Sequence, residues 1–311
     1  MMGYRIIPYH PDYEAALLEL ESVSAQGKHI WLEMLRDHFL ARSEVFEEYG
    51  VFLALSENGD LLGVAAGSAV TLEWNGKRER VGFAYDLRVA PPFRRKGIAT
   101  FLGRYLTQEY FKSLGVNRHI TTIKASNWPA ARVARSTLGI THYYPFSYLT
   151  IPTGMRIRKT TRPGSGLRFR ISGFGVPETV EWVYRHPNGN PALFRTDLTY
   201  RVRAIHIAPW LNFGMRTLEL FKGADWKLPR LGEEVRFATA FDLGPENLQF
   251  LNDLFDHLQK LGIQYLVVCC LKGDYCHRNL RRLAVNSLDY RILVNFPLKP
   301  SDSLTLDVRC L

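Results

Sequence analysis

The sequence predicts an α/β protein with a mixed sheet, in which an antiparallel meander is followed by a strand–helix–strand–helix–strand segment. Two observations predict this order in the first half of the chain. Residues 51–89 contain three apolar runs separated by Asn58-Gly59 and Asn75-Gly76, which are strong hairpin signals. Residues 97–151 then alternate helical and strand patterns. Since 311 residues exceed the usual size of one domain, two domains are expected.

The apolar spacing predicts each element of the first half in order. Leucines at helical spacing mark two early helices, and Pro91-Pro92 ends the third strand of the meander. The expected strands are 4–8, 51–56, 61–74, 79–89, 119–126 and 141–151, and the expected helices are 11–26, 28–48, 97–114 and 128–138.

The second half repeats much of this pattern after a segment that reads as a linker. Pro163-Gly164-Ser165-Gly166 and clustered cations predict a linker at 153–166, between domains at 1–152 and 167–311. The similar ending of both halves indicates a weak internal repeat. The expected helices are 177–186, 190–198, 245–261 and 277–288, and the expected strands are 202–208, 214–222, 234–242, 263–271 and 290–296.

Composition narrows the class of protein. A hydrophobic content of 46% suits a globular core, and no apolar run reaches the ~20 residues of a membrane span. The N-terminus turns polar too early for a signal peptide, so we expect a cytoplasmic protein without membrane contact. The four cysteines lack zinc spacing, so we expect reduced thiols and no metal. They are Cys269, Cys270, Cys276 and Cys310.

The stretch PPFRRKGIAT at 91–100 carries the clearest chemical signal. Arg94, Arg95 and Lys96 precede Gly97 at the start of a helix, where the unpaired amides already create positive potential. Three added cations are unfavourable there unless an anion binds, and phosphate is the obvious anion. The alternative is a solvated basic loop. The net charge of +10, with +8 of it after residue 150, also favours acidic ligands.

This stretch resembles the acetyl-CoA motif of the GNAT acyltransferase superfamily, Arg/Gln-x-x-Gly-x-Gly/Ala, as Arg94-x-x-Gly97-x-Ala99. Asn127, Ala130 and Gly139-Ile140 resemble a later family segment. The resemblance covers residues 1–150 in element order, and the second half resembles the degenerate second domain of tandem GNAT proteins. It implies the acyl-CoA N-acyltransferase fold in two tandem GNAT-like domains.

The resemblance also implies which residues bind acetyl-CoA. The backbone of Leu87, Arg88 and Val89 would pair with the pantetheine arm, and one amide would polarise the thioester carbonyl. Asn127 would hydrogen-bond the pantetheine, although an asparagine before a helix is also an ordinary cap. The pyrophosphate would be held by Arg94, Arg95, Lys96, Gly97, Ile98, Ala99 and Thr100.

Acyl transfer to an amine needs a proton acceptor, and it is helped by a donor for the leaving thiolate. Asp86 is the candidate base, with an ion pair to Arg88 or a sheet neighbour as its structural alternative; Glu73 is a weaker candidate. The family's helix tyrosine is missing at 133–135, so either Tyr144 or Tyr143 acts as the acid, or no protein acid is needed. Tyr144 is the candidate acid, and a packed aromatic ring is its structural alternative.

The sequence thus predicts an acetyl-CoA-dependent N-acetyltransferase acting on a small-molecule or peptide amine, with one CoA site in the first domain. The corresponding loop of the second domain, FDLGPENLQF, has no cation, and Glu246 lies at its helix start. A CoA-binding sensor or scaffold without catalysis is the alternative. Nucleic-acid binding is a third reading, which the scattered cations disfavour. A homodimer is left open.

Overall fold

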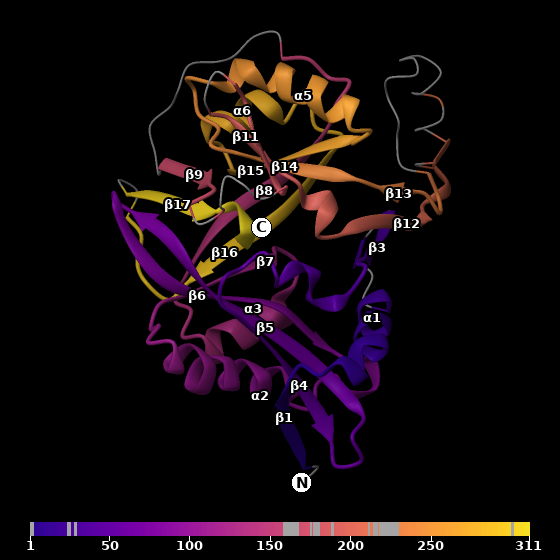
Figure 1. Ribbon diagram of the computed structural model, residues 1–311, viewed down its shortest axis with the longest axis vertical. Coiled ribbons are helices and arrows are strands. Elements are labelled where there is room, and N and C mark those ends of the chain that lie inside the picture. Colours follow the sequence, from indigo (N-terminus) through magenta and orange to yellow (C-terminus); the bar gives the residue numbers. More distant parts are fainter. Residues whose placement is uncertain are drawn as a thin grey trace. The chain divides into compact units, whose positions relative to one another are not determined.

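The computed structural model describes residues 3–23, 26–27, 30–157, 168–174, 176, 181–187, 190–210, 212–213, 217, 230–299 and 302–311. The chain divides into two compact units (Figure 1). The bounds of these units differ from those of the proposed domains 1–152 and 167–311, since residues 289–311 belong to the first unit and 25–36 to the second. The proposed linker at 153–166 lies largely outside the described residues. The first unit is Met1–Ser24, Asp37–Phe146 and Asp289–Leu311, and the second is Ala25–Arg36 and Ser147–Leu288.

The first unit contains a mixed sheet. Its neighbouring strands pair antiparallel from β1 to β6, β6 and β7 pair parallel, and β16 pairs antiparallel with β7. A late strand, β17 (Ser303–Asp307), pairs with β5. The strand order is β1 (Tyr4–Pro8), β4 (Tyr49–Ser56), β5 (Leu61–Trp74), β6 (Lys77–Val89), β7 (His119–Lys124), β16 (Asn286–Val294) and β8 (His142–Pro152).

The meander of the first unit matches its prediction. At the β5–β6 hairpin, Trp74 pairs with Lys77, and Asn75 and Gly76 have φ of 52° and 77°. Both turn residues therefore lie in the left-handed region, which is what a two-residue Asn-Gly hairpin requires. The local turn chemistry fixes this register without help from distant residues.

The helices of the first unit are α1 (Glu14–Ser22), α2 (Ile98–Tyr105) and α3 (Trp128–Thr137). Helix α2 continues into the π-helical turn η4 (Leu106–Phe111), whose Phe111 ring packs over two glycines of the sheet. A Cβ at Gly67 or Gly82 would lie 2.9 Å from that ring. Buried side chains of α2 and α3 share one hydrophobic cluster with β4 and β5, so both helices cover the same face of the sheet (Figure 1).

The helix predicted at 28–48 is wrong. Its described residues form strand β3 (Ile30–Leu35) and the 3-10 turn η2 (Phe39–Arg42). Strand β3 pairs antiparallel with β12 (Arg201–Ile207) in the second unit. Cross-strand pairing with a segment about 170 residues away overrides the helical spacing of the leucines, which the local sequence cannot reveal.

The second unit contains its own parallel strand pair, β14 (Phe237–Phe241) with β15 (Tyr265–Leu271). The helices predicted at 177–186 and 190–198 are wrong, because their described residues include strands β10 and β11. The predicted strand 214–222 lies outside the described residues except for residue 217. The remaining elements are β2 (Gln26–Gly27), β9 (Arg168–Ser172), β10 (Val183–Arg185), β11 (Ala192–Phe194), β13 (Glu234–Val235), α5 (Leu251–Lys260), α6 (Tyr275–Leu280) and the 3-10 turns η1 (Pro11–Tyr13), η3 (Pro91–Phe93), η5 (Thr196–Leu198), η6 (Leu248–Phe250) and η7 (Val308–Cys310).

Within the described residues, every helix is too short or too polar to cross a membrane.

Candidate functional site

The parallel strands β6 and β7 of the first unit pair over only part of their length. Their register joins Gly82 to His119, Phe83 to Ile120 and Ala84 to Thr121, and the pairing then ends. Strand β6 nevertheless continues to Val89, and β7 continues to Lys124. The strands therefore separate toward their carboxyl ends, which leaves backbone groups at that edge available to a ligand that lies between them.

A β-bulge in β6 lies where this separation begins. Tyr85 pairs with Ala66 and Arg88 with Val64, so Asp86 and Leu87 together oppose a single residue of β5. Asp86 has a φ of 48°, a left-handed conformation that aspartate tolerates better than most residues. Leu87, predicted to contact pantetheine, is 37% exposed. The bulge reorients the backbone of the segment that was predicted to bind pantetheine.

Asp86 belongs to a network of buried charges in the first unit. Its carboxylate is only 3% exposed and lies 3.0 Å from Arg42 Nη1 and 3.5 Å from Arg88 Nη2. Arg88 Nη2 also contacts Glu21 Oε1 at 2.5 Å. The expected ion pair with Arg88 is therefore present, and Arg42 is an added partner. The buried carboxylate is therefore paired with two guanidinium groups.

Arg42 and Glu21 are site residues that the sequence analysis missed. Arg42 lies in η2, within the segment wrongly predicted as a helix, and Glu21 lies in α1. Neither has a sequence motif, because only the tertiary fold brings them to β6. Glu73, the weaker candidate base, lies seven residues along β5 from Ala66, which is about 24 Å at the rise of an extended strand. The fold therefore does not bring Glu73 to the bulge.

The cationic turn after β6 has a backbone suited to an anion. Arg95 and Gly97 have φ of 64° and 85°, and Gly97 is the N-cap of α2. Tyr4 donates a hydrogen bond to the Lys96 carbonyl, and Arg94 Nε donates to the Val89 carbonyl. Among the described residues, no carboxylate forms an ion pair with any of these three cations, Arg94, Arg95 and Lys96. Left-handed residues before a helix start turn amides outward as an anion-binding nest.

Asn127 caps α3, which is the structural role given above as the alternative to pantetheine binding. Its Oδ1 accepts a hydrogen bond from the Ala130 amide at 3.1 Å. Because β6 and β7 are parallel, the helices that follow them both begin at the carboxyl edge of the sheet. Helices α2 and α3 also approach closely, since a Cβ at Gly103 would lie 2.6 Å from Thr137 Oγ1. The fold thus brings Asn127 and the cationic turn to one edge.

The hydroxyl of Tyr144 is engaged in structure. It donates to the Leu298 carbonyl at 3.1 Å and accepts from the Leu298 amide at 3.0 Å. The hydroxyl proton that would protonate a thiolate is therefore already in a hydrogen bond to the Leu298 carbonyl. This geometry favours a structural role for Tyr144 over the predicted role as an acid. Tyr143, its alternative, is 57% exposed and lies beside Arg291.

The second unit repeats part of this arrangement. Asp242 follows β14 with a φ of 55°, and its carboxylate lies 3.3 Å from Arg185 Nη1. The same guanidinium lies 5.6 Å from the ring of Phe241, as Arg42 lies 5.2 Å from the ring of Tyr85. The sequences Ala84-Tyr85-Asp86-Leu87 and Ala240-Phe241-Asp242-Leu243 therefore have similar local geometry in the two units.

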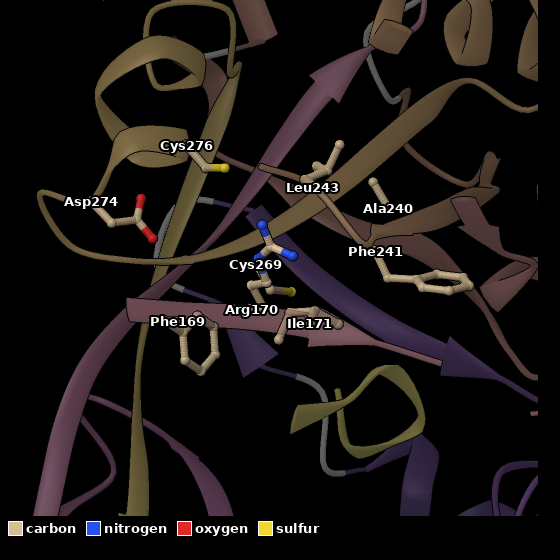
Figure 2. A pocket seen from close by; sticks show the side chains of 9 residues that line it. All are labelled: Phe169, Arg170, Ile171, Ala240, Phe241, Leu243, Cys269, Asp274 and Cys276. Atoms are coloured by element: carbon tan, nitrogen blue, oxygen red, sulfur yellow. The ribbon is translucent and has the colours of Figure 1, made fainter. Parts of the chain in front are cut away.

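A pocket lies beside this repeated segment in the second unit (Figure 2). Arg170, which lines it, pairs with Glu246 at 2.7 Å. Burial raises the pKa of Cys276 to about 12 and that of Asp274 to about 6. A thiol with so high a pKa stays protonated near neutral pH, so it is a weak nucleophile and a weak metal ligand. The residues that line the pocket are Phe169, Arg170, Ile171, Ala240, Phe241, Leu243, Cys269, Asp274 and Cys276.

A parallel strand pair that separates over a bulge, with a cationic turn at one edge, has a geometry suited to an extended phosphate-bearing ligand. Residues 15–140 match the model of the acetyltransferase (GNAT) family. No curated protein matches the chain in sequence.

Solved structures of N-myristoyltransferase from Saccharomyces cerevisiae share the fold of the whole chain. A complex with myristoyl-CoA and inhibitors gives a TM-score of 0.55 at 9% identity, and the match covers 96% of this chain and 82% of the other. A complex with myristoyl-CoA gives 0.54 at 8% identity, covering 96% and 80%. At such identity the likeness concerns the fold alone. It confirms the predicted tandem GNAT fold with its mixed sheet.

Proposed function

We propose that this protein is an N-acetyltransferase that transfers an acetyl group from acetyl-CoA to a primary amine of a small molecule or peptide. The observation that carries the proposal is the cationic turn at 94–97, which lies at the edge where β6 and β7 separate. The family match of residues 15–140 supports an acyl-CoA donor. The choice of acetyl as the acyl group and of an amine as the acceptor goes beyond the family match.

The proposed mechanism assigns each part of the site a task. The pyrophosphate of CoA binds residues 94–100, and the pantetheine arm lies between β6 and β7 against the backbone of 87–89. A main-chain amide of that segment polarises the thioester carbonyl. The amine nitrogen attacks the carbonyl carbon, a C–N bond forms, and the C–S bond breaks. Asp86 takes the amine proton, and water protonates the leaving thiolate, because the Tyr144 hydroxyl is bonded to Leu298.

The first experiment measures donor binding and turnover on the intact protein. Calorimetry with acetyl-CoA, octanoyl-CoA and myristoyl-CoA identifies the preferred acyl length, and a thiol reagent then follows release of free CoA with a panel of amines. We expect acetyl-CoA to bind at a dissociation constant near ~1 μM, about −8 kcal/mol. Tighter binding of a longer donor would replace the acetyl assignment, and absence of binding by every acyl-CoA would reject the proposal.

A CoA-binding sensor without catalysis is the second candidate. It is favoured by the ion pairs of Asp86 and by the engaged hydroxyl of Tyr144, which leave few groups for proton transfer. Acetyl-CoA binding without thiol release across chemically diverse amines would support the sensor.

The two roles of Asn127 can be separated by substitution. We expect Asn127→Ser to keep the α3 cap, because a serine oxygen can accept the Ala130 amide. It removes the side-chain amide that would donate to pantetheine, so acetyl-CoA affinity should fall about 2- to 12-fold, the worth of one hydrogen bond. Asn127→Ala should show this loss and also lower the unfolding free energy by ~1 kcal/mol. Native affinity in Asn127→Ser would leave Asn127 as a cap only.

A further inference from the structure

A long stretch of the chain around α3 contains many cations and no acid. No aspartate or glutamate occurs at 110–177, where there are 11 lysines and arginines, although the whole chain has 30 acids in 311 residues. These cations look scattered along the sequence. Within the first unit, however, the fold places some of them beside two exposed aromatic rings.

Both rings contact one arginine. The guanidinium carbon of Arg291, on β16, lies 4.0 Å from the centroid of the Trp128 ring and 5.3 Å from that of Tyr143. Trp128, at the start of α3, is nevertheless 62% exposed, and Tyr143, on β8, is 57% exposed. The cation–π contacts therefore hold both rings in place while more than half of each side chain faces solvent.

Two further arginines follow the indole along α3. Arg132 and Arg135 lie four and seven residues after Trp128, so the three side chains share one stripe of the helix. Both arginines are exposed. Among the residues that the structure describes, no carboxylate forms an ion pair with Arg132, Arg135 or Arg291. Asp289, two residues before Arg291 on β16, is the acid nearest to that arginine along the strand.

These five residues form what we call the α3 surface, and they are separate from the proposed donor site. In the sheet, β7 lies between β6 and β16. The contact with Arg291 therefore places the indole on the β16 side of β7, away from the cationic turn that follows β6. The residues of the α3 surface are Trp128, Arg132, Arg135, Tyr143 and Arg291.

The chemistry of the α3 surface fits a strand of nucleic acid better than an acidic peptide. Arginine pairs with phosphate and with carboxylate, so the charge alone fits both partners. Exposed aromatic rings stack on bases, which every nucleotide carries and an acidic peptide lacks. Two such rings beside three guanidinium groups supply the two kinds of contact that single-strand sites use, which are stacking and phosphate pairing. The net charge of +10 favours the same partner.

We propose that the α3 surface binds single-stranded nucleic acid, with one base stacked on Trp128 and phosphates paired with Arg132 and Arg135. Arg291 lies over one face of the indole, so the base stacks on the other face. Arg291 is thus a positioning residue, and Tyr143 offers a second ring to a neighbouring base. The inference goes beyond the proposed function and does not depend on it.

The test measures the binding of a labelled oligouridine of about a dozen nucleotides to the full chain, by fluorescence anisotropy over a series of salt concentrations. We expect a dissociation constant of about 1–100 μM near physiological salt. Trp128→Ala should weaken binding about 5- to 150-fold, the worth of one stacked base, and leave the salt dependence unchanged. Arg132→Ala combined with Arg135→Ala should reduce the slope of log affinity against log salt by ~1.4, which is about 0.7 per phosphate contact.

Matched controls remove similar groups from the second unit. Trp210→Ala removes an equally exposed indole, and Arg281→Ala combined with Arg282→Ala removes two exposed cations. Both controls should match the native protein. A thermal melt of each variant checks that it folds. If Trp128→Ala does not fold, Trp128→Leu gives the second reading, because leucine keeps apolar volume at this position without a ring.

Several results would overturn the inference. One is absence of oligouridine binding by the native protein, and another is native affinity in both Trp128 variants. An equal loss in the two double-arginine variants would mean that net charge alone attracts the strand. Equal competition by polyglutamate, a polyanion without bases, would indicate an acidic protein as the partner, and displacement of the oligouridine by acetyl-CoA would place the surface in the donor site. The proposed function stands in each case, since it is measured with acyl-CoA.

Discussion

Arg95→Glu and Gly97→Trp are each expected to weaken acetyl-CoA binding at least ~100-fold. Reversing the charge of Arg95 removes a charge-assisted hydrogen bond, worth about 1.5–3 kcal/mol, and adds repulsion against the pyrophosphate. At Gly97 the backbone has a φ of 85°, and a Cβ there would meet Tyr4 Oη at an ordinary 3.7 Å, so the fold leaves space for the atom. The bulky ring of tryptophan would instead cover the amides of the nest. Calorimetry with acetyl-CoA measures both effects.

The matched control for Gly97 is Gly115→Trp. Gly115 also has a left-handed φ, 68°, and a Cβ there would meet nothing within 4 Å. Both substitutions therefore impose a similar backbone strain, about 1–2 kcal/mol, but only one lies at the cationic turn. We expect similar melting temperatures and a loss of binding in Gly97→Trp alone. Equal binding by Gly97→Trp and the native protein would show that the turn is a solvated basic loop.

Asp86→Asn is expected to lower turnover about 10²- to 10⁴-fold while acetyl-CoA still binds, if Asp86 is the general base. Asparagine tolerates the left-handed backbone that Asp86 adopts, so the bulge is preserved. The variant loses charge opposite two guanidinium groups, which can cost about 3–5 kcal/mol of unfolding free energy for a buried pair. Turnover must therefore be measured beside a melting curve.

Asp242→Asn supplies the matched control for Asp86. It removes the charge of the equivalent residue in the second unit, which also has a left-handed φ and an arginine partner. We expect turnover of Asp242→Asn to match that of the native protein. If Asp86→Asn folds, binds acetyl-CoA and turns over at the native rate, Asp86 is a structural carboxylate and the amine loses its proton to another group.

The parts of the fold that were predicted correctly depend on local chemistry. The Asn-Gly turn sets the β5–β6 register, because only residues that accept left-handed backbone fit a two-residue hairpin. The strand–helix–strand–helix order of 79–137 could also be predicted from local chemistry, because amphipathic spacing and terminating glycines act over a few residues. The cationic turn was also readable, because its arginines and glycine are contiguous.

The charge network at the bulge could not be read from the sequence. Arg42 and Glu21 reach Asp86 and Arg88 from segments 44 and 67 residues away in the chain. The ion pair between Asp86 and Arg88 was expected, because alternate residues of a strand share a face, but the position of the bulge was not. The engagement of Tyr144 by Leu298 is likewise a contact between residues 154 apart.

The sequence by itself determined the turns, the strand–helix–strand segment of the first unit, and the residues of the cationic turn, because each depends on neighbours along the chain. The tertiary structure alone decided that residues 30–35 form a strand and that β16 pairs with β7 in the first unit. It also decided which arginines surround Asp86. These features depend on pairing and burial between distant segments, whose free energy exceeds the small local preferences that a sequence pattern expresses.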